Sequence, residues 1–194
     1  MAPPTERALT SALIGHLSRQ NDDGETLIAS QRDICWREGR IDVIVVNGSL
    51  SGFEIKSGRD SLRRLPRQVD LFGRVLDYAT LVCHERHTGH ATDLLPDWWG
   101  LIVATAHSAG VEFDILRPPE PNPMVHPYEL ARMLHVDELI AELAIVRRLK
   151  GISTLRQADL AWLLADLTRP DEMRLLVRKR LRQRPSWRAA ASRT

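Results

Sequence analysis

The sequence predicts a mixed α/β fold, in which helices flank a central mixed sheet and a helical extension follows at the C-terminal end. Three observations lead to this prediction. A helical pattern comes first, strand and helix patterns then alternate up to residue 117, and only helical patterns follow residue 127. This order favours a sheet with helices packed on its faces. The chain has 194 residues, 43% of them apolar, which is enough for one such core and a small extension.

The N-terminal part is predicted from apolar spacing. Leucine and isoleucine at helical spacing predict a helix over residues 4–18, and Thr5 precedes it as a suitable N-cap. A loop at 21–24 and a short strand over residues 25–30 are expected next. Residues 34–38 fit neither the helical nor the strand pattern clearly.

Two strands joined by a tight turn come next and carry most of the functional interest. β-branched residues predict a strand over 41–46, and Asn47-Gly48 is a strong turn signal. The second strand is predicted over residues 50–57. Because side chains alternate along a strand, Glu54 and Lys56 are expected to share one face of it.

The remaining elements are predicted from the helical and strand periodicities of the apolar residues. A helix is predicted over residues 60–77, where Pro66 either lies in the first turn or kinks the helix. Strands are then expected at 78–83, 100–106 and 111–116, a short helix at 87–95, and later helices at 128–134, 136–149, 154–167 and 171–184. These elements divide the chain into a core over 1–117, a proline-rich linker over 118–127, a basic helical extension over 128–186 and a loose tail over 187–194.

The charge is unevenly distributed. Residues 1–146 contain 14 Lys/Arg and 21 Asp/Glu, whereas residues 147–194 contain 13 Lys/Arg and 4 Asp/Glu. A basic arm of this kind is suited to polyanions such as DNA, although a solvated helical tail is an equal alternative. The candidate contacts in the arm are Arg178, Lys179, Arg180 and Arg182.

The composition also predicts the cellular compartment of the protein. The two cysteines, Cys35 and Cys83, lie far apart, so we expect no disulfide framework and a reducing cytoplasm. The N-terminal residues do not resemble a signal peptide, and no apolar run approaches the roughly 20 residues that span a bilayer. The sequence therefore predicts a cytoplasmic protein without a membrane segment.

The strand pair carries a candidate metal site. Mg²⁺ prefers oxygen ligands, which Asp42, Glu54 and the main-chain carbonyl of Ile55 would supply. Lys56, on the face of Glu54, would hold the attacking water or neutralise developing negative charge. The plainer reading is a surface hairpin on which Glu54 and Lys56 merely pair. A zinc site at Cys83, His84, His87 and His90, and a second acidic set at Asp97, Glu112 and Asp114, are weaker alternatives.

The spacing of these residues resembles that of the PD-(D/E)XK nuclease superfamily. The match comprises Arg40-Ile41-Asp42, an eleven-residue gap, Glu54-Ile55-Lys56 and then Gln68 with Phe72. The last pair resembles the Gln-x-x-x-Tyr motif of the RecB-like branch, and residues 52–82 with Pro-Asp-Trp-Trp-Gly at 96–100 resemble a small, poorly characterised bacterial group. The resemblance covers residues 5–117 and implies a restriction-endonuclease-like fold. It also implies Mg²⁺ or Mn²⁺ as cofactor and catalytic roles for Asp42, Glu54, Lys56 and Gln68.

The sequence departs from this pattern in three ways. Isoleucine rather than proline precedes Asp42, a replacement that is common in the superfamily. Phe72 stands where tyrosine is expected, so a hydroxyl contact is lost. The superfamily usually adds an acid upstream of Asp42, and here Glu6, Gln31 and Asp33 are the residues to consider, with Glu6 the candidate ligand. Phosphate contacts are expected from arginines at the start of the Gln68 helix, namely Arg63, Arg64 and Arg67.

Two functional hypotheses result. The first is a Mg²⁺-dependent deoxyribonuclease that acts in DNA repair, defence or mobile-element biology. The second is a nuclease-fold module that binds DNA or a partner protein without cutting. The sequence leaves open whether the protein acts as a homodimer.

Overall fold

The computed structural model describes residues 4–21, 24–147 and 149–187. The predicted class is confirmed: a six-stranded mixed sheet is flanked by helices and followed by C-terminal helices. The strands are β1 (Leu27–Ile34), β2 (Gly39–Val46), β3 (Leu50–Lys56), β4 (Tyr78–Cys83), β5 (Gly100–His107) and β6 (Gly110–Arg117). The helices are α1 (Glu6–Gln20), α2 (Leu65–Val75), α3 (Thr88–Leu94), α4 (Pro127–Ala131), α5 (Val136–Arg147), α6 (Gln157–Leu167) and α7 (Pro170–Gln183). Three 3-10 turns are η1 (Cys35–Arg37), η2 (Glu85–His87) and η3 (Ile152–Thr154).

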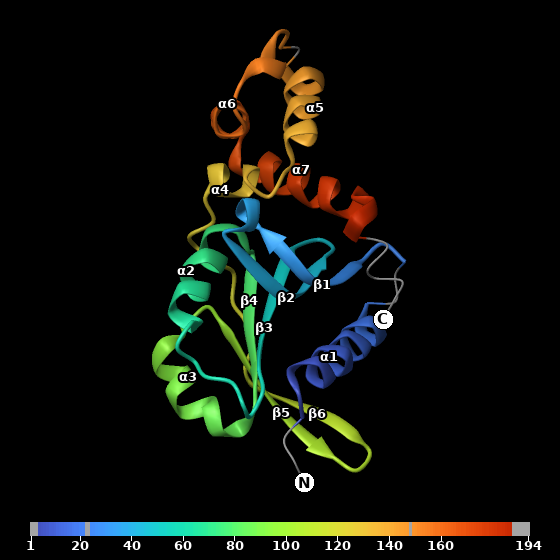
Figure 1. Ribbon diagram of the computed structural model, residues 1–194, viewed down its shortest axis with the longest axis vertical. Helices are drawn as coiled ribbons and strands as arrows, with labels where there is room; N and C mark the ends of the chain where they lie inside the picture. Colours follow the sequence, from blue (N-terminus) through green and yellow to red (C-terminus); the bar gives the residue numbers. More distant parts are fainter. Residues whose placement is uncertain (1–3, 22–23, 148, 188–194) are drawn as a thin grey trace.

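The strands lie in the sheet in the order in which they occur in the chain (Figure 1). The strands β1, β2 and β3 form an antiparallel meander, the pairs β3–β4 and β4–β5 are parallel, and β6 returns antiparallel to β5. The two parallel connections contain α2 and α3, as parallel pairing requires a crossover segment. The C-terminal end of β3 therefore leads directly into the loop before α2.

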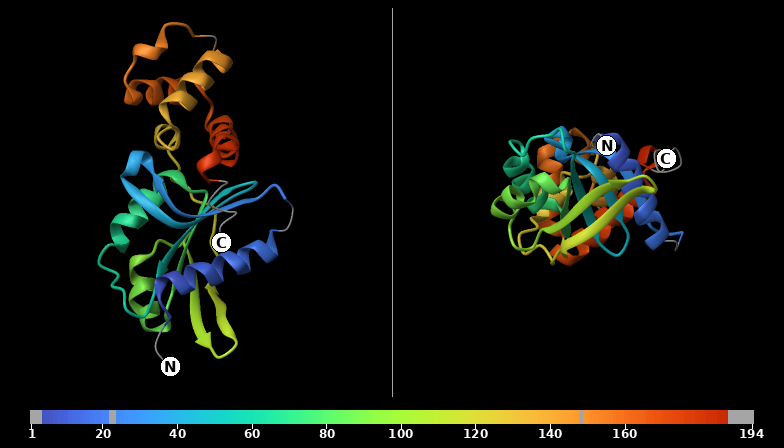
Figure 2. Two further views of the ribbon diagram at one scale, coloured as in Figure 1. Left: turned by 45° about the vertical axis from the view of Figure 1, so that its right-hand side comes forward. Right: turned by 90° about the horizontal axis from the view of Figure 1, so that it is seen from below.

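Helices cover both faces of the sheet. Helix α1 buries Leu9 and Leu13 against Val43 and Ile55 on one face. Helices α2 and α3 cover the other face, where Phe72 lies in the larger apolar cluster. Figures 1 and 2 show α1 on one side of the sheet and α2 and α3 on the other. Because side chains alternate along strands, even-numbered residues of β2 and β3 face α2.

The C-terminal helices α4–α7 stack beyond one end of the sheet (Figures 1 and 2). Their buried side chains, such as Leu160 and Val177, belong to the same apolar cluster as the α2 face of the sheet. The proline-rich segment 118–127 packs along α2, where the Asn122 amide donates hydrogen bonds to the carbonyls of Gly73 (2.8 Å) and Leu76 (2.7 Å). The C-terminal extension is therefore attached to the rest of the fold through the shared apolar cluster and through α2.

Several predicted boundaries shift. Thr5 caps α1 as predicted, since its Oγ1 accepts a hydrogen bond from Ala8 N at 3.2 Å. Helix α2 begins at Leu65 with Pro66 in its first turn, which decides between the two readings of that proline. Strand β1 extends to Ile34 because it pairs with β2 along its length. Trp187, expected as the first residue of a loose tail, is instead buried, and residues 188–194 lie outside the described part.

The connection between β1 and β2 is a left-handed turn. Cys35, Trp36 and Arg37 have φ values of 47°, 57° and 71°, a region that residues other than glycine rarely occupy. Contacts of Trp36 with the C-terminal part of the chain offset the cost of this conformation. Its Nε1 donates to the Leu134 carbonyl at 3.2 Å. No helix in the described residues is long and apolar enough to cross a bilayer.

Candidate functional site

The site is located where β2 and β3 separate. The two strands pair from Val43 to Val46, but residues before Val43 continue to pair only with β1. Asp42 fills the gap: its Oδ2 accepts a hydrogen bond from the Ile55 backbone N–H at 2.8 Å. The carboxylate thus replaces a strand backbone as the partner of β3. Asp42 is only 8% exposed, so its position is fixed by the sheet.

The second oxygen of Asp42 also has a partner. Gln31 Nε2 donates to Asp42 Oδ1 at 3.1 Å, from a backbone with φ of 52°. Asp33, the other upstream candidate, is half exposed and pairs with Arg37 at 3.5 Å. The upstream strand therefore contributes an amide, rather than an acid, to the immediate surroundings of Asp42.

Glu54 and Lys56 share the α2 face of β3, as predicted. They are 1% and 3% exposed, and Lys56 Nζ donates to Glu54 Oε1 at 2.5 Å. The plainer reading of an exposed surface pair is therefore wrong. Within the described residues, Glu54 Oε2 and Gln68 Oε1 are buried without a hydrogen-bond partner. Buried oxygens without partners are rare, because each costs roughly 1–3 kcal/mol.

Burial and like charge govern the electrostatics. Burial, and then the Asp42 carboxylate, raise the pKa of Glu54 to about 7, while Lys56 acts in the opposite direction. Glu6, in the first turn of α1, has a raised pKa for the same reasons, partial burial followed by Asp42 and Asp60. Mutual repulsion among these carboxylates therefore favours the protonated forms of Glu6 and Glu54.

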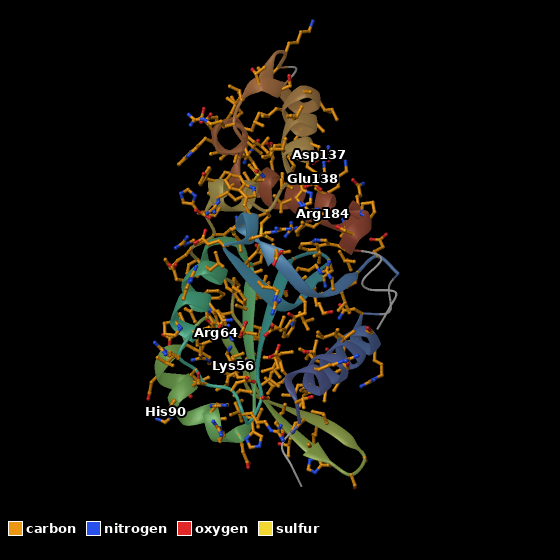
Figure 3. The ribbon with its side chains drawn as sticks, viewed as in Figure 1. Lys56, Arg64, His90, Asp137, Glu138 and Arg184 are labelled. Carbon is orange, nitrogen blue, oxygen red and sulfur yellow. The ribbon has the colours of Figure 1, made fainter. Side chains whose placement is uncertain are left out.

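These groups line one cavity of about 540 Å³. Glu6, Asp42, Glu54, Lys56 and Gln68 line it together, so the structure brings together the residues that the sequence predicted. Its other walls carry five arginines, Arg37, Arg40, Arg63, Arg64 and Arg67. Figure 3 shows Lys56 on the sheet and Arg64 beside it, in the segment that leads into α2. A cavity with carboxylates inside and arginines around them is suited to a phosphate ester and a cation together.

Phe72 follows Gln68 by one helical turn and keeps only the packing role of the expected tyrosine. Its side chain is fully buried and stacks on Trp99 with ring centroids 5.7 Å apart. Trp98 and Trp99 are both buried, which confirms that they pack in the core beside Asp97.

Two of the four candidate residues in the basic run of α7 are paired within the chain. Arg178 pairs with Asp77 at 3.2 Å, and Arg180 pairs with Glu142. Lys179 is exposed and Arg182 is half-buried, so these two are the members of the run that remain open to solvent. The extension therefore uses part of its positive charge to attach itself to the core.

Sequence reasoning missed the loop after Lys56. Asp60 Oδ2 accepts hydrogen bonds from Ser57 N (2.7 Å) and Ser57 Oγ (2.6 Å), which closes the turn that leaves the site. Ser57 O in turn lies 3.0 Å from Nε2 of the buried His87. The Ser-x-x-Asp spacing was the available signal, because such pairs commonly close turns. His87 is therefore occupied with this loop.

The donor set suits a hard divalent cation. Asp42 and Glu54 offer carboxylate oxygens, Ile55 lines the same cavity, and Glu54 Oε2 is a buried oxygen that lacks a partner. Among the described residues, no group of three or more His, Cys, Asp or Glu side chains is arranged to hold a metal. A cation here would therefore rest on two carboxylates, as Mg²⁺ often does, with the remaining ligands supplied by carbonyls and water.

The fold and the cavity together define a mixed α/β protein with a buried Asp-Glu-Lys cluster on one face of its sheet. Residues 3–190 match the model of the bacteriophage P4 protein cII family, and the chain belongs to this family.

Two individual proteins are similar. The chain is 29% identical to protein cII of Enterobacteria phage P4 over 112 residues, which is 58% of this chain and 42% of that protein. The match thus spans less than half of the phage protein. Among solved structures, a protein of unknown function from Silicibacter pomeroyi, SPO1766, aligns with 80% of this chain and all of its own at 16% identity and a TM-score of 0.46.

Proposed function

We propose that this protein is a Mg²⁺-dependent deoxyribonuclease of the PD-(D/E)XK type, which hydrolyses DNA phosphodiester bonds in the cavity of Asp42, Glu54 and Lys56. One observation carries the proposal. Two buried carboxylates and a buried lysine meet in a cavity walled by arginines, and burial beside Asp42 raises the pKa of Glu54 to about 7. A pKa shifted by burial and a neighbouring charge in a cleft is typical of functional sites. Mn²⁺ would fit the same oxygens.

Each residue has a role that its position supports. Asp42, Glu54 and the Ile55 carbonyl would hold Mg²⁺, with Glu6 approaching from α1. The metal would polarise the phosphate and lower the pKa of a water. Lys56 places a positive charge beside the reacting phosphate. Gln68 Oε1, a buried acceptor without a partner among the described residues, can orient a water.

The arginines would bind the DNA backbone on either side of the reacting phosphate. Arg63, Arg64 and Arg67 are exposed on the cavity wall, and Arg40, two residues before Asp42, lines the same cavity. Contacts of this kind neutralise phosphates and give affinity that falls with salt. Of the settings considered, membership in the family of a phage protein favours mobile-element biology.

The test is cleavage of supercoiled and linear DNA with Mg²⁺ or Mn²⁺. We expect the wild type to cut, and Asp42→Asn and Lys56→Ala to lose at least a hundredfold in rate. Asp33→Asn is the matched control, because Asp33 lines the same cavity but is half exposed and paired with Arg37. A wild-type protein that cuts neither substrate with either metal would refute the nuclease proposal.

Two observations favour a second candidate, a module that binds DNA or a partner protein without cutting. Lys56 Nζ already occupies Glu54 Oε1, and the described residues bring no third acid into contact with Asp42. Calorimetric titration with Mn²⁺ separates the candidates. Binding that Asp42→Asn abolishes supports the enzyme, whereas DNA binding without any metal binding supports the module.

A further inference from the structure

A second polar cavity lies between the β1–η1 segment and the C-terminal helices. It has a volume of about 390 Å³, within the range of small-ligand sites. One wall comes from β1 and η1, and the other comes from the region of α4 to α7. Figure 3 shows Arg184 and Glu138 together where these helices meet the sheet, at some remove from Lys56.

The lining of this cavity is strongly basic. Its charged residues are four arginines and a single carboxylate, Arg32, Arg37, Arg132, Arg184 and Asp33. The carboxylates that pair with Arg184 and Arg132 are not part of the lining. Glu138 accepts from Arg184, and Arg132 pairs with both Glu129 (2.8 Å) and Glu38 (2.9 Å). Because these carboxylates offset Arg132 and Arg184, the excess of positive charge at the cavity comes from Arg32 and Arg37, which face the single carboxylate of Asp33.

Two of the arginines are held rigidly. Arg184 is 7% exposed, donates to Glu138 and to the Met133 carbonyl, and lies over the Trp187 ring at 5.2 Å. Arg132 lies over the Trp36 ring at 5.0 Å, and its Nε is buried without a partner among the described residues. Guanidinium groups fixed in this way lose little entropy when they bind an anion.

The other two arginines are less committed. Arg32 donates to the carbonyls of Ser30 (2.7 Å) and Ser186 (3.3 Å), and it forms no ion pair within the described part of the chain. Arg37 is exposed and makes one ion pair, with Asp33 at 3.5 Å. Both side chains can therefore turn their charge to an incoming anion without breaking the core.

The second cavity adjoins the first. Asp33 and Arg37 line both, and Gln31, which donates to Asp42, lines the second. A chain of phosphates that passes the carboxylates of the first cavity would meet Arg37 next and then Arg32. The two cavities thus form a path of positive charge across the β1–η1 turn.

We propose that the second cavity is a phosphate-binding site, which takes either a backbone phosphate of a nucleic acid strand or a free phosphorylated ligand. Arginine is the side chain best suited to this chemistry, since its planar fork binds phosphate oxygens in pairs. The site does not depend on metal or on cleavage. It therefore stands or falls separately from the nuclease proposal.

The test is binding in metal-free buffer with EDTA at one fixed salt concentration. The probes are inorganic pyrophosphate, followed by calorimetry, and a fluorescently labelled thymidine oligonucleotide, followed by anisotropy. Arg32→Gln and Arg37→Gln remove the two flexible arginines. Arg156→Gln is the matched control, because Arg156 is as exposed as Arg37 and likewise pairs weakly with one aspartate, at 3.3 Å. Arg40→Gln tests the first cavity alone.

We expect Arg32→Gln and Arg37→Gln each to weaken at least one probe tenfold or more, and Arg156→Gln to stay within twofold of the wild type. Loss of oligonucleotide binding alone identifies a nucleic acid strand as the ligand, and loss of pyrophosphate binding identifies a free phosphorylated ligand. Three results would overturn the site: no binding of either probe, an Arg32→Gln protein within twofold for both, or equal losses for Arg156→Gln. Affinity that depends on Arg40 and not on Arg32 would likewise overturn it.

Discussion

Asp42 Oδ2 accepts a hydrogen bond from the Ile55 backbone N–H at 2.8 Å, at the point where β2 and β3 separate. The contact links the first carboxylate of the site to the residue between Glu54 and Lys56. The hydrogen bond makes Asp42 a structural part of the sheet. This explains how the Asp42 carboxylate can stay buried beside that of Glu54. The proposed chemistry and the stability of the sheet would therefore depend on the same side chain, and variants must separate them.

Substitution of Asp42 should separate these two roles. Asp42→Ala leaves Ile55 N–H and Gln31 Nε2 without acceptors, so we expect the free energy of unfolding to fall by about 1–3 kcal/mol. In Asp42→Asn the amide oxygen can accept from Ile55, and the Gln31 amide can turn to accept from the new NH₂. The loss should then stay below about 1 kcal/mol. Urea denaturation measures both, and equal losses would show that charge, not the acceptors, matters.

Glu54 should make the metal-free protein less stable as pH rises. Its pKa is about 7 in the folded protein, against 4.5 for an ordinary glutamate, so the folded state binds the proton more tightly. The contribution of Glu54 to the free energy of unfolding is fully present below the pKa of the unfolded state. It is lost as pH rises toward about 7, at up to roughly 1.4 kcal/mol per pH unit. Denaturation with EDTA from about pH 4.5 to pH 8 checks this. A constant difference from Glu54→Gln across this range would contradict the assignment.

Asp77 should hold the C-terminal helices to the sheet. Its Oδ2 accepts from Leu50 N (2.8 Å) and pairs with Arg178, while Oδ1 pairs with Arg174 at 3.1 Å. Asp77→Ala leaves these donors unpaired in a mostly buried place, and we expect a loss of about 3 kcal/mol. Hydrogen exchange should show faster exchange in α7.

The control for this prediction is Asp171→Ala, which also removes a partner of Arg174. Asp171 is 85% exposed and its ion pair measures 3.6 Å. Exposed pairs contribute little, so the loss should be below about 1 kcal/mol. Similar losses for the two variants would mean that the ion pairs of α7 do not anchor it.

Gly52 should be required by close packing beneath β3. A Cβ at this position would collide with Cδ1 of Leu76, which is fully buried and cannot move aside. Gly52→Ala should therefore lower the free energy of unfolding by about 1–3 kcal/mol. Gly48 has open space around its Cβ position, so Gly48→Ala should change it by no more than about 0.5 kcal/mol. Thermal denaturation of both variants decides the point.

Much of the site could be predicted from local sequence. Alternation along β3 was enough to place Glu54 and Lys56 on one face. Gln68 was expected at the site from the resemblance to the PD-(D/E)XK pattern, and it lines the same cavity. The turn at Asn47-Gly48 sets the register between β2 and β3, which brings Asp42 within hydrogen-bond distance of Ile55. These are short-range relationships, for which residue type and period are sufficient.

The rest depended on contacts between residues far apart in the chain. Arg178 is paired with Asp77, 101 residues away, and Arg180 with Glu142, so the basic run could not be recognised as partly structural. Gln31 reaches Asp42 from a left-handed backbone conformation that no propensity predicts. The second cavity needs both β1 and the C-terminal helices, and therefore leaves no local pattern.

The proposed divalent metal site at Asp42 and Glu54 is tested most directly by anomalous scattering from a crystal soaked in Mn²⁺. We predict a peak between the Asp42 and Glu54 carboxylates, within about 2.0–2.4 Å of at least one oxygen of each, with the Ile55 carbonyl as a further ligand. The peak should be absent from Asp42→Asn and present in Asp33→Asn. A soaked wild-type crystal without manganese between these two carboxylates would contradict the claim.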